Sequence, residues 1–359
     1  MKVVVIGGGN GSYAAVADLV EAGHDVRWWR RDRALFEDIL RAGGITVTDH
    51  AGSREVAVAP TDDLAAALDG AALILAPTPA FAQEDIAEAL APHLVDGQVI
   101  YLPPGTFGSY IMLKRIRERG SKADVAIAET GTLPWLARKQ GPLAVRITTR
   151  ASRLPTGVLP ARLTEHALAV IGQAFPGAIE PAQDALAGAL MNAGPIIHPP
   201  LILMNAGPIE HFDRWDIHNE GTQPAIRRTH TALDNERIAV REALGYGVPH
   251  FPLSDHYETS NWMYGNLAHD KLVDSGDWHE SLDLKTHRYM QEDVGLGLSF
   301  LVSVGAWAGV PTPVAAGLLA IASTVAETDF RKGGRTFENL GLDGLDRAQL
   351  RQILREGLS

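Results

Sequence analysis

The sequence contains no cysteine among its 359 residues. Disulfides, thiolate nucleophiles and cysteine-ligated metal sites are therefore excluded. Long basic runs are also missing: 32 Lys and Arg stand against 43 Asp and Glu, which gives a formal net charge of −11 at pH 7. An acidic chain without a basic tract is not expected to bind nucleic acid or an anionic membrane surface.

Membrane and metal signals are weak as well. One long uncharged stretch, 294–326, is divided by Pro311 and Pro313 into pieces shorter than the about 20 residues of a bilayer span, so we expect buried core helices there. No signal-peptide pattern opens the chain, and we expect a cytoplasmic protein. The histidines show no HxH or HxxxH spacing, and we predict no metal site; we interpret four of them as core or solvated residues, namely His211, His218, His230 and His269.

The chain is longer than one hydrophobic core usually supports, and its pattern changes part-way along. Up to residue 183, apolar strand-like runs alternate with helical patterns, which predicts an α/β fold with a Rossmann-type, doubly wound parallel sheet. Strands are expected at 3–6, 26–29, 72–76, 99–102, 125–128 and 144–147, and helices at 83–94 and 111–119. Residues 184–359 read as an all-helical second domain.

A glycine-rich turn, GGGNGS, follows the first predicted strand and opens a helix. In such a loop, Gly7 allows a tight turn and Gly9 lets the backbone approach a pyrophosphate. The free amides of the helix N-terminus then favour the anion, and we predict cofactor contacts from the loop members Gly7, Gly9, Asn10, Gly11 and Ser12. Ser12 replaces the usual third glycine, which is compatible with slightly wider helix–strand packing.

The second predicted strand ends in WWRRDR, where an NAD enzyme normally carries an acid for the ribose hydroxyls. Arg30 and Arg31 occupy that place instead. Guanidinium groups match a 2′-phosphate through charge-assisted, two-pronged hydrogen bonds, so NADP(H) is favoured over NAD(H). Two alternatives remain: a solvated basic turn, or a shifted turn in which Asp32 serves the ribose.

In the second domain, the segment MNAGPIIHPPLILMNAG places three strongly polar side chains in an apolar setting: Asn192, His198 and Asn205. If a helix begins at Pro199, Asn205 lies about two turns beyond His198, on roughly the same face. A histidine near a helix N-terminus has a lowered pKa, which suits a proton donor and acceptor. The alternative for His198 is a buried core histidine without a catalytic role. We predict that Asn192 and Asn205 bind substrate.

A second polar cluster, THRYMQEDVGLGLSF, contains Arg288, Glu292 and Asp293. One carboxylate of this cluster is a candidate to orient His198, and Arg288 is a candidate clamp for a substrate carboxylate. The alternative for the carboxylate is a helix cap. Charged residues elsewhere are interpreted as an exposed helix face, namely Glu236, Arg237 and Arg241.

Five segments occur together in one order: GGGNGS, AETGTLPWLAR at 128–138, HPPLILMNAG at 198–207, RYMQEDVGLG at 288–297 and TDFRKGGRTFENLGL at 328–342. In this combination, the chain resembles the opine dehydrogenase family, which includes octopine and nopaline dehydrogenases and bacterial N-(1-carboxyethyl)amino acid dehydrogenases. The resemblance spans essentially the whole chain.

The resemblance implies NAD(P)H-dependent reductive condensation of a 2-oxo acid, such as pyruvate, with the amino group of an amino acid, and the reverse oxidation. It implies that His198 is the acid–base group, that Asp293 pairs with it, that Arg288 meets the oxo-acid carboxylate and that Asn205 lies in the substrate pocket. Arg30 stands where NAD-using relatives often carry an acid.

Two other functions are compatible with the same two-domain plan. One is an NAD(P)-dependent dehydrogenase of a 2-hydroxy acid or a polyol phosphate, which would need no amine. The other is a non-catalytic NADP(H) sensor that presents its helical domain to a partner. For the leading hypothesis we expect small-molecule substrates and a homodimer.

Overall fold

The computed structural model describes residues 1–265, 268–276 and 282–358. These residues form two compact units, one of residues 1–189 together with the segment that starts at Gln352, and one of residues 190–351. The chain therefore passes between the units twice. The predicted change at 183/184 lies just before α7 (Ala185–Ala189), a short helix of the first unit. The division into a dinucleotide-binding domain and a substrate domain at that point stays a prediction.

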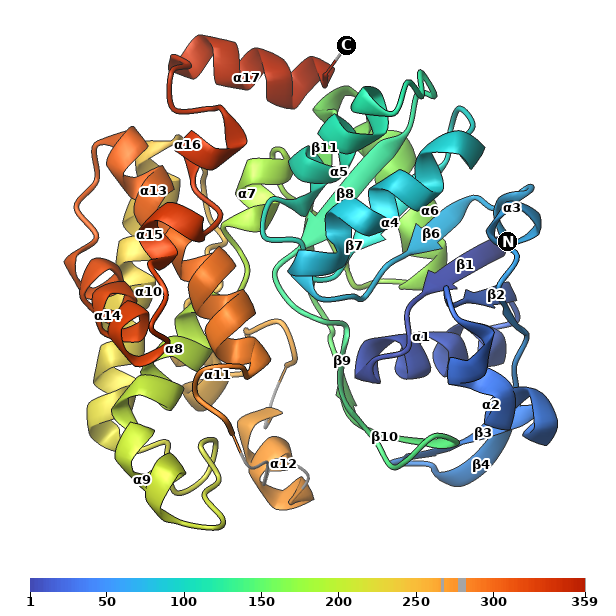
Figure 1. Cartoon of the computed structure of the whole chain (residues 1–359), viewed down its shortest axis with the longest axis horizontal. Coiled ribbons are helices and arrows are strands. Elements are labelled where there is room, and N and C mark those ends of the chain that lie inside the picture. The colour runs from blue at the N-terminus through green and yellow to red at the C-terminus, as the bar shows by residue number, and fades with distance from the viewer. Residues whose placement is uncertain (266–267, 277–281, 359) are drawn as a thin grey trace. The chain divides into compact units, whose positions relative to one another are not determined.

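An eight-stranded sheet forms the centre of the first unit (Figure 1). Its order is β12-β11-β8-β7-β6-β1-β2-β5, and every described pair is parallel except β11 with β8. The strands are β1 (Lys2–Ile6), β2 (Asp25–Trp29), β5 (Pro60–Thr61), β6 (Leu73–Leu75), β7 (Val99–Leu102), β8 (Ala126–Thr130), β11 (Leu154–Leu159) and β12 (Ile179–Pro181). The predicted Rossmann-type sheet is confirmed, and its central strands are buried because helices cover it.

The helices of this unit follow the strands in the predicted alternation. They are α1 (Asn10–Glu21), α2 (Glu37–Ala42), α3 (Leu64–Leu68), α4 (Gln83–Leu90), α5 (Gly108–Glu118), α6 (Thr164–Ala174) and α7, with short 3-10 turns η1 (Arg33–Phe36), η2 (Ala80–Ala82), η3 (Ala91–His93) and η4 (Ala161–Leu163). The helix predicted at 83–94 corresponds to α4 and η3, and the one predicted at 111–119 corresponds to α5.

A second sheet of four strands packs on α1 in the same unit (Figure 1). Its order is β4 (Gly52–Ala57), β3 (Gly44–Asp49), β10 (Ala144–Arg150) and β9 (Trp135–Lys139). The assignment of 144–147 to the main sheet is therefore wrong. A short apolar run predicts a strand but not its partner, and here the antiparallel β9–β10 hairpin decides the partner.

Ion pairs fasten this second sheet to α1. Arg150 bonds to Asp18 of α1 at 2.7 Å and to Asp49 of β3 at 2.8 Å. Arg54 of β4 bonds to Asp49 at 2.9 Å and also to Glu21 of α1. The two arginines hold the pKa of the buried Asp49 carboxyl well below its usual range. The network therefore holds the sheet against the helix that carries the glycine loop.

Every regular element in the described residues of the second unit is a helix, as predicted. Its elements are α8 (Gly194–Met204), α9 (Ala206–His211), α10 (Pro224–Ala243), α11 (Ser254–Glu258), α12 (Ala268–Ser275), the π-helix η5 (Tyr289–Leu298), α13 (Ser299–Ala308), α14 (Pro313–Val325), α15 (Phe330–Gly333) and α16 (Phe337–Leu340), while α17 (Arg347–Glu356) leads back to the first unit. The uncharged stretch 294–326 forms the end of η5 and the separate helices α13 and α14. One segment of the described chain, Ala185–Met204, is long and apolar enough to cross a membrane, but 78% of its apolar window is buried in the protein.

Glu236, Arg237 and Arg241 of α10 are buried, so their interpretation as an exposed face is wrong. Glu236 accepts hydrogen bonds from the amides of Val314 (2.7 Å) and Ala315 (2.9 Å) at the start of α14. Arg237 is 4% exposed and bonds to Asp234 at 2.6 Å, and Arg241 is 1% exposed. These charges are tolerated in the core because helix ends and counter-charges satisfy them.

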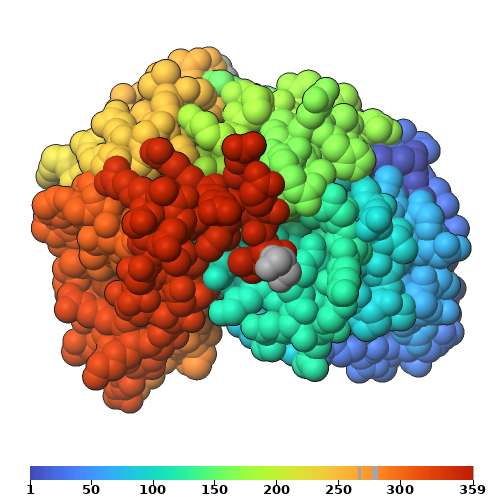
Figure 2. All heavy atoms as spheres, turned by 90° about the horizontal axis from the view of Figure 1, so that it is seen from above, coloured from blue at the N-terminus to red at the C-terminus, as the bar shows by residue number. Residues whose placement is uncertain are grey.

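The residues from Gln352 onward, at the red end of the colour bar in Figure 2, belong to the first unit. Arg117 of α5 donates a hydrogen bond to the carbonyl oxygen of Leu358 at 3.1 Å. A Cβ at Gly357 would stand 3.3 Å from Pro160 and 3.4 Å from Leu113, so the chain end is closely packed there. The return of the chain to the first unit is therefore held by specific contacts.

Candidate functional site

The glycine loop joins β1 to α1 in the first unit. Gly7 has a φ of 100°, a conformation that side chains other than glycine rarely adopt. A Cβ at Gly9 would meet no protein atom within 4 Å, so the space beside it is open. Gly11 instead packs tightly, since a Cβ there would lie 2.7 Å from Leu133. The loop thus presents the amides of α1 beside an open space, which fits a bound pyrophosphate.

Ser12 uses its hydroxyl at the position where a third glycine is common. Its Oγ donates to the carbonyl oxygen of Ile6 at 3.1 Å, and the side chain is fully buried. Ser12 therefore ties the first turn of α1 to the end of β1. The Ser12 side chain fills the space beside β1 that a glycine would leave empty, and its hydroxyl is hydrogen-bonded there.

Two tryptophans of the WWRRDR segment are structural. Trp28 donates from Nε1 to the carbonyl oxygen of Gly7 at 2.6 Å, and the Tyr13 ring meets it edge-on with centroids 4.7 Å apart. Trp29 donates to the carbonyl oxygen of Asp62 at 3.2 Å. At the end of β2, Trp28 therefore supports the glycine loop through its hydrogen bond to Gly7.

The two arginines that follow point to different partners. The Arg30 guanidinium lies over Gly8, where a Cβ would stand 2.5 Å from its Cζ. Arg31 is exposed and pairs with Asp85 of α4 at 3.3 Å. Asp32 accepts from the amide of Ala34 in its own turn, at 2.9 Å. Only Arg30 of the predicted pair lies against the loop, and the cofactor roles of both stay predictions.

A buried carboxylate that sequence reasoning missed organises the loop after β7. Glu129, at the end of β8, accepts from the amides of Phe107 (2.7 Å) and Ser109 (3.2 Å) and from the Ser109 hydroxyl. Thr106 and Phe107 both have positive φ, 55° and 61°. Glu129 therefore holds a strained turn at the carboxyl edge of the sheet, where ligands of such folds bind. Its position in AETGTLPWLAR gave no chemical signal, because its partners lie at the start of α5, 22 and 20 positions earlier in the chain.

In the second unit, His198 of α8 and Asp293 of η5 meet. His198 Nδ1 and Asp293 Oδ2 are 2.8 Å apart, although the residues are 95 positions apart in the chain. The Tyr289 ring stacks on the His198 ring with centroids 3.7 Å apart and planes at 11°. Burial raises the pKa of the Asp293 carboxyl, and the charges of Arg288 and His287 oppose that shift. The structure thus joins the two residues predicted as an acid–base pair; their catalytic roles stay predictions.

Small residues make this meeting possible. A Cβ at Gly194 would stand 2.2 Å from Asp293 Oδ1, and one at Gly297 would stand 2.1 Å from Pro195. The glycines therefore let α8 and η5 approach closely. The π-helical turn geometry of η5 is rare and occurs frequently at functional sites.

The start of α8 differs from the prediction. The helix begins at Gly194, not at Pro199, so His198 lies a turn inside it. Asn192, just before the helix, accepts from the Gly194 amide at 3.0 Å, and Pro195 fits the first turn of the helix. The expected effect of the helix N-terminus on His198 is therefore weakened, because that field decays within the first turn.

Asn205 is occupied by protein groups. Its amide donates to the carbonyl oxygens of Leu201 (2.8 Å) and Gly221 (3.1 Å), and its Oδ1 accepts from Trp215 at 3.0 Å. It ties the end of α8 to the following loop, and a substrate contact stays a prediction. Arg288 is 56% exposed and lies 3.8 Å from Glu292, so its guanidinium remains open to a ligand.

Histidines collect around His198. The His218 ring lies 6.1 Å from it, and His230 Nε2 donates to the carbonyl oxygen of Ile197 at 2.9 Å. Burial is the main cause that lowers the pKa of His230 to about 4 and that of His256 to about 3. His218 and His230 are core residues, as expected. No group of three or more potential metal ligands occurs in the part of the chain that the structure describes.

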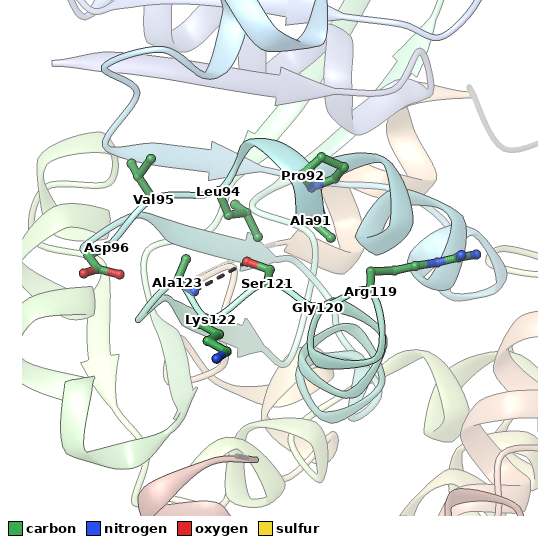
Figure 3. A pocket seen from close by; sticks show the side chains of 10 residues that line it. All are labelled: Ala91, Pro92, Leu94, Val95, Asp96, Arg119, Gly120, Ser121, Lys122 and Ala123. Atoms are coloured by element: carbon green, nitrogen blue, oxygen red, sulfur yellow. Dashed lines mark hydrogen bonds between the residues drawn. The ribbon is translucent and has the colours of Figure 1, made fainter.

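A surface hollow of about 650 Å³ lies elsewhere in the first unit (Figure 3). Its lining includes Val95, Asp96, Ser121 and Lys122, from the loops that lead into β7 and β8. These loops are at the amino edge of the sheet. Ligands of doubly wound sheets bind at the carboxyl edge, so this hollow is not the cofactor site.

Comparisons with known proteins agree with both units. The family model of the NAD/NADP octopine/nopaline dehydrogenase alpha-helical domain matches residues 181–326, and that of ketopantoate reductase PanE/ApbA matches residues 3–153. An opine dehydrogenase from Arthrobacter sp. (strain 1C) is 30% identical over 98% of both chains. An octopine dehydrogenase structure with NADH and agmatine has a TM-score of 0.73 at 21% identity, covering 100% of this chain and 99% of that one. A yersinopine dehydrogenase with NADP⁺ has a TM-score of 0.67 at 14% identity, covering 99% and 98%. The chain therefore belongs to the opine dehydrogenase family of NAD(P)-dependent oxidoreductases.

Proposed function

We propose that this chain reductively condenses a 2-oxo acid with the amino group of an amino acid, and catalyses the reverse oxidation. The observation that carries the proposal is the partly buried His198–Asp293 pair, set in the helical unit that matches the octopine/nopaline dehydrogenase domain. An exposed arginine, Arg288, lies on the same polypeptide segment as Asp293. The proposed substrates carry carboxylates, which an arginine binds through paired hydrogen bonds.

The residues present fit a nicotinamide dinucleotide. The loop from Gly7 to Ser12 offers backbone amides and the open space beside Gly9, and Asn10 and Gly11 belong to the same turn. Bound there as the reduced form, the cofactor supplies a hydride. The protein's own part is to hold the pyrophosphate and the adenosine end.

The proposed role of His198 is proton transfer. Condensation of an oxo acid with an amine expels water, so protons must be taken up and released beside the reacting carbon. With Nδ1–H directed to Asp293, the basic nitrogen of His198 is Nε2. Asp293 then fixes this tautomer and stabilises the charged imidazolium.

Substrate positioning falls to the remaining predicted residues. Arg288 would hold the oxo-acid carboxylate. Asn192 lies just before α8, and Asn205 lies just after it, bonded to Gly221 and Trp215. We propose that a substrate contacts both asparagines.

We further propose a preference for NADP(H). Arg30 supports it, because its guanidinium lies over the loop at the end of β2 and finds no carboxylate partner among the residues that the structure describes. Arg31 would contribute to this preference only if its ion pair with Asp85 broke.

We also propose that the protein is a homodimer and that it is cytoplasmic. Light scattering tests the oligomeric state.

The experiment is oxidation of NADPH and NADH, separately, with pyruvate, oxaloacetate or 2-oxoglutarate, each with and without a panel of amino acids. We expect turnover only when an amine is present, and faster turnover with NADPH. Turnover with the oxo acid alone would instead identify a 2-hydroxy acid dehydrogenase. Cofactor binding without turnover for any substrate pair, unaffected by His198→Ala, would favour the sensor function.

A further inference from the structure

A second cation lies at the glycine loop, and it comes from the four-stranded sheet. Lys139, the last residue of β9, places its Nζ 3.4 Å from the carbonyl oxygen of Gly8 and 4.4 Å from the centroid of the Tyr13 ring. Its backbone amide donates to Asn10 Oδ1 at 3.0 Å. The lysine is therefore fixed at both its backbone and its side chain, beside the residue that Arg30 covers.

These two cations are uncompensated. Across residues 1–265, 268–276 and 282–358, no carboxylate pairs with Lys139 or with Arg30, and both are half-buried. The nearby arginines of the same sheet behave differently: Arg54 and Arg150 each bond to two carboxylates. Two like charges that lie near one another and are partly shielded from water disfavour one another, and an anion between them reduces that cost.

The titration of the neighbouring groups agrees with this geometry. Burial lowers the pKa of Lys139, and the charge of Arg30 lowers it further. Burial raises the pKa of the Tyr13 hydroxyl, while Arg30 opposes that shift. Lys139, Arg30 and Tyr13 therefore interact in one small region above the loop.

The region is also rigid. The Tyr13 ring under Lys139 is held by its edge contact with Trp28, and Trp28 is bonded to Gly7. The Tyr13 hydroxyl donates to the carbonyl oxygen of Pro142 in the β9–β10 hairpin, at 2.8 Å. A cation site that is already ordered loses little entropy when it binds an anion.

We propose that Lys139 and Arg30 together bind the 2′-phosphate of NADP(H), and that Lys139 is a specificity-determining residue supplied by the second sheet. The inference rests on the proposed use of a nicotinamide dinucleotide. The pyrophosphate is accounted for by the amides at the start of α1, whereas Gly8 and the end of β2 face the adenosine ribose in folds of this topology. A phosphate monoester dianion there matches one guanidinium fork and one ammonium.

Binding, measured by titration calorimetry, tests the proposal without turnover. The probes are NADPH, NADH, adenosine 2′,5′-bisphosphate and 5′-AMP, and the variants are Lys139→Met and Arg30→Met. We expect Lys139→Met to weaken NADPH and the bisphosphate by roughly tenfold or more, as loss of a charge-assisted hydrogen bond does. NADH and AMP should stay within about twofold, and the salt dependence of NADPH binding should decrease.

The matched control is Arg33→Met, which removes an exposed charge from the same turn, where Arg33 lies 3.9 Å from Asp62. It should leave all four affinities unchanged. Lys139→Gln is a second variant that keeps a polar side chain, and thermal unfolding shows that each variant is folded. Equal losses for NADPH and NADH in folded Lys139 variants, or no loss for either, would overturn the proposal.

The experiments distinguish a failure of the proposed 2′-phosphate site from a failure of the proposed reaction. A wild-type protein that prefers NADPH through Lys139 but turns over no oxo acid with an amine overturns only the proposed reaction. A protein that condenses the substrates but binds NADH and NADPH alike overturns the 2′-phosphate site and leaves the reaction intact.

Discussion

The two chemically important regions of this protein are built in opposite ways. The glycine loop and Arg30 lie within a short stretch at the start of the chain, and backbone groups provide much of the site. The proposed acid–base pair joins His198 to Asp293 across 95 positions, and side chains provide all of it. A site made of backbone tolerates side-chain changes as long as the turn survives. A site made of two converging side chains is lost when either is replaced.

This comparison predicts its largest effect at His198. Replacement by Gln keeps the size and polarity but removes the proton-transfer nitrogen, and kcat should fall by about 10²–10⁴-fold. Because the proposed NADPH site lies in the first unit, affinity for NADPH should remain. A variant with near-normal kcat would show that His198 is only a core histidine.

Asp293→Asn should separate stability from activity. Since burial raises the pKa of this carboxyl, ionising it costs folding free energy, a cost that grows as pH rises through that pKa. Asn removes the cost at neutral pH, so the unfolding temperature should stay equal or rise. The amide cannot balance an imidazolium, so we expect kcat to fall by about 10²-fold.

The check is thermal unfolding and kcat of the Asp293→Asn protein measured between pH 6 and 9. A large drop in unfolding temperature would show that Asp293 serves the fold, as a helix cap would. Glu292→Gln, which removes the neighbouring carboxylate of the same helix, is the control variant for these measurements.

Glu129→Gln tests the positioning of the loop after β7. The carboxylate accepts from two amides and one hydroxyl, whereas an amide has one acceptor oxygen and places an NH₂ against a donor. We expect a loss of about 1–3 kcal/mol in stability, as for a buried unsatisfied group. KM for the cofactor should rise more than kcat falls. Unchanged KM alongside reduced stability would make Glu129 purely structural.

The smallest effect concerns Asp49, which fastens the second sheet to α1. Arg54 and Arg150 lower its pKa, so its contribution to stability is present above the unfolded value near 3.8 and is lost as pH falls through the lower folded value. Asp49→Asn should cost about 1–2 kcal/mol at pH 7 and progressively less below pH 4. Urea unfolding at both pH values measures this. Asp25→Asn, at an exposed pair with Arg27, is the control and should change little.

The sequence by itself determined the elements whose patterns are local. The apolar runs of β1, β6 and β7 predict buried parallel strands, and the glycine turn after β1 predicts the start of α1. The prolines and glycine around 309–313 predict the break between α13 and α14. Each of these follows from backbone preferences and hydrophobic period, which act over a few residues.

Only the tertiary structure decided which distant residues meet. It placed β10 in a second sheet, started α8 at Gly194 and buried Arg241 in the core. It directed Arg31 away from the loop and brought Lys139 to it, although nothing near Lys139 in the sequence marks a cofactor contact. The physical reason is that strand partners, helix contacts and buried charges depend on which surfaces pack together, and that choice is made by the whole chain rather than by any segment of it.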